Sequence, residues 1–200
     1  MDTLQAIKER RAVKNYDPEF KIPQKDIDTL LEHAIQAPTS FNIQHWRLVL
    51  VENPTIRQQI REAAWDQAHV TESSLLFVMC ADIKSWDKEP ERYWKNAPKS
   101  AQDILVPMIK PFYEGKEQLQ RDEALRSTGI IAQTIMLTAK ALGYDSCPMI
   151  GFDADKVSEI IKLPEHHLVS MLLVVGKATS PAWPKPGQLP LTDILIKDTF

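Results

Sequence analysis

Residues 75–81, Leu-Leu-Phe-Val-Met-Cys-Ala, restrict the fold more than any other stretch, because they are apolar at every position. The run has the length of a strand and is short for a helix. A strand without a polar face has to be covered on both sides, as in the centre of a layered sheet. We therefore predict a sheet built around residues 75–81, with structure on each face.

Two more stretches have the composition of strands, residues 47–51 and residues 168–175, and a shorter one covers residues 144–147. Between them, apolar residues recur at the spacing of amphipathic helices. The predicted helices cover residues 2–9, 24–37, 53–64, 118–142 and 154–162. The longest would end at Gly143, and its small residues would let another helix approach closely, in the core or at a subunit interface.

The segment from residue 82 to residue 120 mixes exposed charges with aromatic residues and is interrupted by Pro98, Pro107 and Pro111. We predict short helices that form an excursion over the main body. Such an excursion is either a helical pair packed on the surface or a mobile lid over a pocket.

Residues 178–200 are predicted to form an arm, because prolines are concentrated between Pro181 and Pro190 and residues 191–196 are strand-like. An arm of this kind has no core of its own. We expect it to be extended and to end in an edge strand, which could pair on another subunit.

Length, charge and cysteine content exclude several classes of protein. A chain of 200 residues is long enough for one sizeable core and short for two full domains. A net charge of −3 gives no reason to expect nucleic acid, and no apolar run suggests a membrane span. The start of the chain lacks the pattern of a secretory signal, so cytoplasmic residence is expected. The two cysteines form neither a disulfide framework nor, with histidines, a zinc pattern.

Three polar segments are candidates for a binding site. Arg10, Arg11 and Lys14 could clamp a phosphate, although such clusters are commonly solvated surface. In residues 37–46, hydroxyls and amides alternate with apolar residues, which suits the edge and face of a flat heterocycle but also an ordinary connection. The turn after residue 148 would leave the N–H groups of Ile150 and Gly151 free to donate to a ligand ring.

Taken in order, these segments resemble the flavin-dependent nitroreductase family. Residues 10–14, Arg-Arg-Ala-Val-Lys, are similar to its R-x-S-x-R/K segment, and residues 37–46 are similar to its A-P-S-x-x-N-x-Q-P/H-W segment. Residues 148–152 are similar to its P-x-x-G-F turn, and residues 188–191 are similar to its R-L-P-L tail. The resemblance covers nearly the whole chain.

The resemblance implies an α+β fold, with a central mixed, mainly antiparallel sheet flanked by helices and one unit spanning residues 1–200. It also implies a homodimer that exchanges the C-terminal strand and holds two FMN molecules at the subunit interface. Arg10 and Lys14 would hold the phosphate, and Pro38, Thr39 and Ser40 would line the flavin of the second subunit. The residues implied for cofactor binding are Arg10, Arg11, Ala12, Lys14, Pro38, Thr39, Ser40, Asn42, Gln44, Asp66, Met149, Ile150, Gly151, Lys177 and Gln188.

Three residues depart from the family pattern. Ala12 replaces a serine and Gln188 replaces an arginine, so we expect weaker phosphate binding, with Lys177 and Lys185 compensating. Asp66 stands where many members have asparagine, and its charge would disfavour an anionic reduced flavin unless it points away.

The activity implied is reduction of nitroaromatics or quinones by NADH or NADPH, in two half-reactions through FMN. No side-chain acid or base is required, because the cofactor carries the chemistry. The aromatic residues Phe41, Trp94, Phe112 and Tyr113 are candidates for the acceptor pocket, with simple packing as the alternative. No metal is expected: the pair at His166 and His167 is assigned to a surface turn, and His45 and His69 are expected to be satisfied polar residues.

Other functions stay open at this point. Ala12 and Gln188 would suit a flavin-binding storage or sensing module without turnover. The long helix and the arm would also suit a helical interaction protein without a cofactor, which leaves the polar segments unexplained. A related dehalogenase or flavin-fragmenting activity lacks a readable signal in residues 82–120.

Overall fold

The strand β2, Leu75–Asp82, is buried along its whole length, as predicted for a strand covered on both faces. The computed structural model describes residues 1–200, and β2 is one of two central strands in a four-stranded sheet of order β1-β2-β4-β3. The other strands are β1 (Trp46–Leu50), β3 (Asp145–Met149) and β4 (His167–Gly176). All three pairings are antiparallel, and the only parallel pairing is the isolated bridge from Ala12 to Ser146. The predicted α+β fold is confirmed, whereas the mixed sheet is antiparallel except at that bridge.

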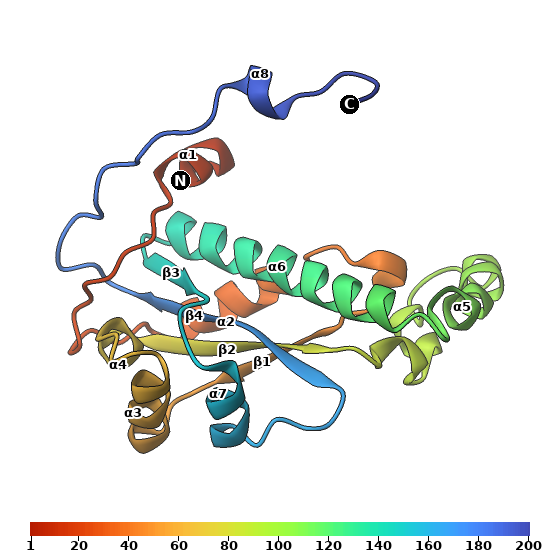
Figure 1. The fold of residues 1–200 in the computed structure, drawn as a ribbon, viewed down its shortest axis with the longest axis horizontal. Helices are drawn as coiled ribbons and strands as arrows, with labels where there is room; N and C mark the ends of the chain where they lie inside the picture. Colours follow the sequence, from red (N-terminus) through yellow and green to blue (C-terminus); the bar gives the residue numbers. More distant parts are fainter.

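Helices cover both faces of this sheet (Figure 1). The α-helices are α1 (Thr3–Glu9), α2 (Gln24–Ala34), α3 (Pro54–Ala63), α4 (His69–Glu72), α5 (Lys99–Tyr113), α6 (Glu117–Ala141), α7 (Ala154–Ile160) and α8 (Leu191–Ile194). Three short 3₁₀ turns are η1 (Ser40–Asn42), η2 (Ser85–Asp87) and η3 (Pro90–Tyr93). Helices α2 and α6 lie on one face, and α3 and α7 lie on the other. None of the helices combines the length and the apolar composition that a bilayer crossing requires.

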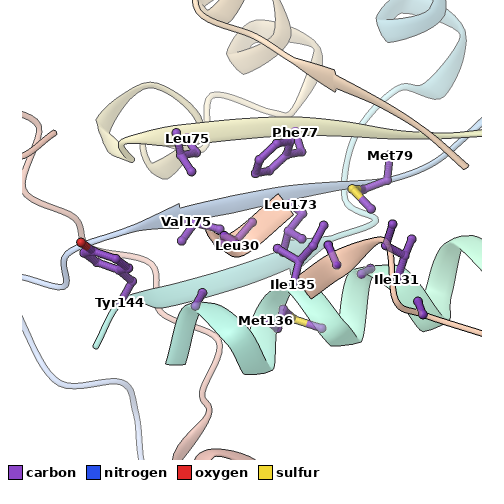
Figure 2. Packing of buried hydrophobic residues seen from close by; sticks show 14 of the residues in the cluster. Leu30, Leu75, Phe77, Met79, Ile131, Ile135, Met136, Tyr144, Leu173 and Val175 are labelled. Carbon is purple, nitrogen blue, oxygen red and sulfur yellow. The ribbon is translucent and has the colours of Figure 1, made fainter. Parts of the chain in front are cut away.

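Alternate side chains of β2 enter two different cores. Leu75, Phe77 and Met79 pack with Ile131 and Ile135 of α6 (Figure 2). The intervening side chains join a second core with residues of α3 and α7, which include Leu76, Val78, Cys80, Ile60 and Val157. Because each fully buried side chain of this size contributes about 1.5–3 kcal/mol, the sheet is stabilised from both faces.

The long helix α6 ends as its sequence predicts. The N–H of Gly143 donates to the carbonyl of Lys140, and the N–H of Tyr144 donates to the carbonyl of Ala139. Gly143 has a φ of +89°, which a glycine adopts without steric cost. This turn leads the chain directly into β3.

Two predicted features differ in the structure. Pro107 and Pro111 do not divide the excursion, because both lie inside the continuous helix α5. Residues 191–196 do not form a strand: Leu191–Ile194 is one helical turn and the rest of the arm is extended. Figure 1 shows the arm passing α1 at the edge of the molecule, away from the four-stranded sheet. A terminal strand needs a neighbouring strand to pair with, and the arm meets none in the single chain.

Candidate functional site

The segment of residues 10–14 runs alongside β3 at the edge of the sheet. Ala12 bridges Ser146, and the N–H of Val13 donates to the carbonyl of Ser146 over 3.1 Å. This pairing holds the alternate residues Arg10, Ala12 and Lys14 along one side of the segment. The sheet edge therefore presents a short row of cations.

These cations line a cavity of about 560 Å³ between the segment and the arm. Its lining residues are Arg10, Arg11, Ala12, Lys14, Asn15, Pro181, Ala182, Trp183, Lys185, Pro186, Gly187 and Gln188. Arg11 donates to the carbonyl of Trp183, and Asn15 donates to Ser180 over 3.0 Å, so the arm is held against the segment. No carboxylate lines the cavity. Its positive charge is thus available to an anion.

The arm contributes the cation Lys185 to this cavity, but Lys177 lies elsewhere. The ammonium of Lys177 stands over the ring of Phe20, 5.2 Å from its centre, and Lys177 does not line the cavity. The charge of Lys177 is engaged in a cation–π contact outside the cavity, so its compensating role stays a prediction. Gln188 does line the cavity, next to Lys185 in the arm.

Two titratable side chains beside Lys14 stay uncharged at neutral pH. Burial lowers the pKa of His69, and the charge of Lys14 lowers it further. Burial also raises the pKa of the Cys147 thiol, which outweighs the opposite effect of Lys14 and Arg10. Neither group supplies a negative charge to neutralise the cations.

The turn that follows β3 leaves two backbone donors unpaired. The N–H groups of Ile150 and Gly151 make no hydrogen bond, and Ile150 is 83% exposed. Met149, one residue earlier, is buried in the sheet. The expected pair of free donors is present, on the same sheet edge as the row of cations.

A second turn, at residues 64–67, packs against this pair of donors. The side-chain amide of Gln67 donates to the carbonyl of Gly151 over 2.8 Å. Asp66 forms an ion pair with Arg61, with 2.7 Å between Oδ1 and Nε. Its charge is therefore partly neutralised by Arg61. The sequence singled out neither Trp65 nor Gln67, because this region has no periodicity and reads only as an irregular polar stretch.

The loop of residues 37–46 lies at the opposite edge of the sheet from these groups. It leads into β1, which is one edge strand of the sheet, whereas β3 is the other edge strand. The first residue of β1 pairs with Ala81 at the end of β2 that lies beside the start of β4, and β3 pairs with the second half of β4. Asn42 donates to the carbonyl of Tyr93 over 2.7 Å, and Gln44 is 3.5 Å from the carbonyl of Asn42. Thr39 has a buried hydroxyl without a partner, while Pro38 is exposed and Ser40 is half-buried. Within one chain, the loop of residues 37–46 therefore lies away from the cations of residues 10–14.

The four aromatic candidates for an acceptor pocket gather beside this loop. The rings of Phe41 and Phe112 are 5.4 Å apart, those of Phe41 and Tyr113 are 6.3 Å apart, and the Trp94 indole donates to the carbonyl of Phe41. Tyr113 is fully buried and stacks on Trp86. For Tyr113 the packing alternative therefore holds, whereas Phe112 keeps 42% of its surface exposed.

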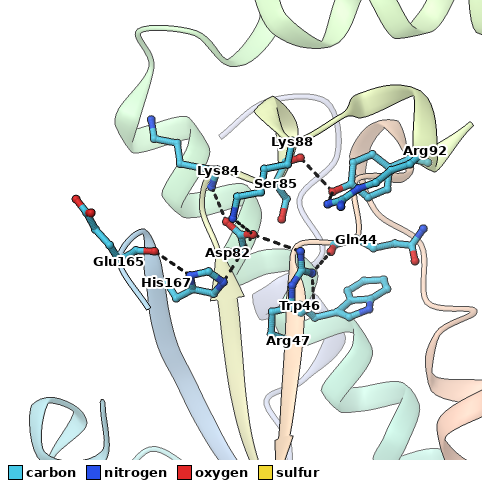
Figure 3. Close-up of polar contacts among 11 residues, drawn as sticks. Gln44, Trp46, Arg47, Asp82, Lys84, Ser85, Lys88, Arg92, Glu165 and His167 are labelled. Atoms are coloured by element: carbon cyan, nitrogen blue, oxygen red, sulfur yellow. Dashed lines mark hydrogen bonds and ion pairs between the residues drawn. The ribbon is translucent and has the colours of Figure 1, made fainter. Parts of the chain in front are cut away.

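A buried carboxylate joins the excursion to the sheet (Figure 3). Asp82 ends β2 and lies 2.7 Å from Lys88, 3.3 Å from Arg47 and 3.7 Å from His167. Burial alone would raise the pKa of Asp82, but the hydrogen bonds from Lys88 and from the backbone of Lys84 outweigh it and hold the pKa below its usual range. His167 is thus the first residue of β4 rather than part of a surface turn.

Two histidines that were expected to be satisfied are not. His45 is fully buried beside Tyr113, and neither ring nitrogen has a hydrogen-bond partner. Burial lowers its pKa to about 4, so the ring is neutral at physiological pH. The Nε2 atom of His69 is also buried without a partner.

Comparison with known proteins identifies relatives of this chain. The model of the Nitroreductase family matches residues 7–177. "Protein DrgA" of Synechocystis sp. is 50% identical over 200 residues, covering 98% of this chain and 95% of that protein. "Putative NAD(P)H nitroreductase MhqN" of Bacillus subtilis is 32% identical over 177 residues, covering 86% of each chain. A crystal structure from Exiguobacterium sibiricum, described as a "putative nitroreductase in complex with FMN", has a TM-score of 0.90 and 30% identity over 98% of this chain and 97% of its own.

Proposed function

The chain belongs to the nitroreductase family, and we propose that it is an FMN-dependent oxidoreductase that uses NADH or NADPH to reduce nitroaromatic or quinone acceptors. The observation that carries the proposal is the row of cations at residues 10–14, on the same sheet edge as the unpaired donors of Ile150 and Gly151. A related protein of known structure is described as an FMN complex, and a relative is named as an NAD(P)H nitroreductase.

The residues of this edge fit the chemistry of FMN. A phosphate needs cations without a competing carboxylate, and the cavity at Arg10, Arg11, Lys14 and Lys185 meets that requirement. A flavin ring offers acceptors along one edge, and the free N–H groups of Ile150 and Gly151 can donate to them. Ala12 adds no hydroxyl and Gln188 adds no charge, so Lys185 supplies the charge of the arm.

When bound, FMN would supply a two-electron relay, accepting hydride from the nicotinamide and delivering it to the acceptor in two half-reactions. The chain's own part is to bind and orient. Arg10 and Lys14 would hold the phosphate, and the Ile150 and Gly151 N–H groups would stabilise negative charge on the ring. The Arg61–Asp66 pair would keep the carboxylate charge partly neutralised near the site.

We further infer that two copies complete two sites. The loop of Pro38, Thr39, Ser40, Asn42 and Gln44 lies at the sheet edge opposite the cations, so the loop of a second copy would supply the other wall. Exposed apolar residues support such a pairing: Leu4 and Ile7 on α1, and Leu189, Leu191, Ile194, Leu195 and Ile196 on the arm. The exposed face of Phe112, with Phe41 and Trp94, would then border the acceptor slot.

The test is a flavin spectrum of the purified protein, followed by anaerobic addition of NADH or NADPH and then of a quinone. We expect bound FMN, bleaching by a nicotinamide nucleotide and re-oxidation by the quinone. Arg10→Gln and Lys14→Gln should each weaken FMN binding by about tenfold, because each removes one charge-assisted contact. Lys25→Gln, on the exposed side of α2, is the matched control. Absence of flavin binding would refute the proposal, and binding without bleaching would indicate a storage or sensing module.

A further inference from the structure

Two turns that lie far apart in the sequence are joined at the site. The turn of residues 64–67 follows α3, and the turn of residues 150–153 follows β3. The N–H of Asp153 donates to the carbonyl of Ala63 over 2.9 Å, and Gln67 donates to the carbonyl of Gly151 over 2.8 Å. The Trp65 ring is so close to Gly151 that a Cβ there would lie 2.9 Å from Cζ3. The turn that follows α3 therefore packs against the turn that follows β3 and is hydrogen-bonded to it.

The side-chain amide nitrogen of Gln67 makes two hydrogen bonds in this contact. Its Nε2 atom donates to the carbonyl of Ala64 over 3.1 Å as well as to that of Gly151, which uses both amide hydrogens. One bond holds the side chain to its own turn, and the other reaches across to the donor turn. Gln67 thus acts as a strut between two backbone segments.

The turn that carries Gln67 is conformationally unusual. Trp65 and Asp66 have φ angles of +54° and +56°, in the left-handed region that side chains other than glycine disfavour. Consecutive residues of this kind persist only where surrounding contacts hold them, and they are found mainly at functional sites. The contacts that hold this turn include the Arg61–Asp66 pair, the Gln67 amide and the backbone bond from the N–H of Asp66 to the carbonyl of Arg61.

The strut acts on the turn that carries the two N–H donors, and through it on the N–H of Gly151. The carbonyl of Ile150 is engaged by the N–H of Phe152 over 3.1 Å, and the carbonyl of Gly151 is engaged by Gln67. The Gly151 carbonyl shares its peptide plane with the N–H of Phe152, and the Ile150 carbonyl shares its plane with the N–H of Gly151. Holding both carbonyls therefore restrains the peptide planes on either side of Gly151 and fixes the direction of the unpaired Gly151 N–H. We propose that Gln67 is a positioning residue, which aims the Gly151 N–H at the ring that accepts electrons.

This inference rests on the proposed flavin function and adds a residue to it. Donors held in place stabilise charge that appears on reduction better than donors that must reorient. Loss of the Gln67 amide should therefore weaken the preference of the site for reduced over oxidised FMN. It should leave the binding of oxidised FMN nearly unchanged, because Gln67 does not line the cationic cavity.

The experiment compares Gln67→Met with the control Gln58→Met in the full chain. Gln58 is exposed on α3, and its amide contacts only Glu62. For each protein, the dissociation constant of oxidised FMN and the midpoint potential of bound FMN are measured. We expect Gln67→Met to bind oxidised FMN within about threefold of wild type. We expect its preference for reduced FMN to fall by about tenfold, which lowers the potential of a two-electron couple by about 30 mV.

Each other outcome decides the question. An unchanged potential in Gln67→Met, with or without a lower unfolding temperature, would show that the strut serves stability alone and would overturn the inference. If Gln67→Met does not fold, Gln67→Glu keeps the length and removes both donors, and an unchanged potential in that variant overturns the inference equally. A wild-type protein that binds no FMN would instead refute the proposed function.

Discussion

Gly151 occupies a position at which a methyl group would displace a neighbouring side chain. A Cβ there would lie 2.9 Å from the Trp65 ring, which is too close, and 3.5 Å from the Gln67 amide, which is an ordinary contact. At the residue scale, the site therefore depends on an absent side chain as much as on its cations. The glycine lets two turns approach within hydrogen-bonding distance.

Gly151→Ala should destabilise the protein by about 1–2 kcal/mol, because the new methyl overpacks against Trp65. Trp65 is 70% exposed and can shift outward, which keeps the loss at the low end for a clash. Urea unfolding measures the change. In a protein that already carries Trp65→Ala, adding Gly151→Ala should cost little, because the ring that the methyl meets is gone. An equal cost of Gly151→Ala with and without Trp65 would contradict this account.

His45 provides a second residue-scale prediction, which concerns pH. Burial depresses its pKa from 6.5 to about 4 in the folded state, so the unfolded chain binds the proton more readily. The stability it contributes is complete above pH 6.5 and is lost as the pH falls from 6.5 to about 4, by up to about 3 kcal/mol.

Urea unfolding at pH 7, 5.5 and 4.5 tests this expectation. His45→Phe should show a smaller loss across that window, and His33→Phe, on the exposed face of α2, should behave as wild type. Equal pH dependence in wild type and His45→Phe would refute the role of His45. Asp82 does not confuse the result, because its depressed pKa places its loss at lower pH.

At the scale of elements, a buried carboxylate links the start of the excursion to the sheet. Asp82 at the end of β2 contacts Lys88, which follows η2, and Arg47 of β1. Below it, Ile43, Trp86, Ile109 and Tyr113 form a small separate core. Helix α5 therefore packs on this separate cluster, while the segment that precedes it is linked to the sheet by the charge of Asp82.

Asp82→Asn should cost about 1–3 kcal/mol, because a buried hydrogen-bonded charge is lost while its cationic partners are half exposed and can be hydrated. Hydrogen exchange should accelerate mainly in residues 83–98, where the attachment is released. Asp103→Asn breaks the exposed pair with Lys99 and should cost less than about 0.5 kcal/mol. Uniform acceleration across the sheet would contradict a local attachment.

At the scale of the whole molecule, the arm forms one wall of the cationic cavity. The end of the arm packs in neither of the two main cores. Trp183, Lys185 and Gln188 line the cavity, while residues 185–200 are exposed. Lys185 also donates to the carbonyl of Lys8 over 2.7 Å, which links the arm to the end of α1. The part of the arm that lines the cavity is therefore separate from the residues that form the hydrophobic cores.

A chain ending at Ser180 should keep its unfolding free energy within about 1 kcal/mol, because little buried surface is removed. Its FMN affinity should fall by more than about tenfold, since a cation and a cavity wall are lost together. Flavin titration and urea unfolding measure the two effects, and sedimentation velocity reports whether the arm also holds two copies together. Lys185→Gln separates the charge from the wall, and unchanged FMN affinity in both variants would contradict this role of the arm.

The sequence alone was sufficient wherever a feature depends on near neighbours along the chain. The apolar run at residues 75–81 predicted the doubly buried strand, and Gly143 predicted the end of α6. The helix predicted over residues 53–64 is α3, Pro54–Ala63, which Asn53 caps. Hydrophobic periodicity, capping and glycine conformation act within a few residues, so they can be recognised without the fold.

The tertiary structure decided which side chains meet. Lys177 and Lys185 are equivalent as charges in the sequence, but Phe20 engages one and the cavity receives the other. Gln67 reaches Gly151 across 84 residues, and the order of strands places the loop of residues 37–46 on the far edge of the sheet. Contacts of this kind depend on strand order and on the path of the turns, because packing brings together residues whose local sequences carry no signal of each other.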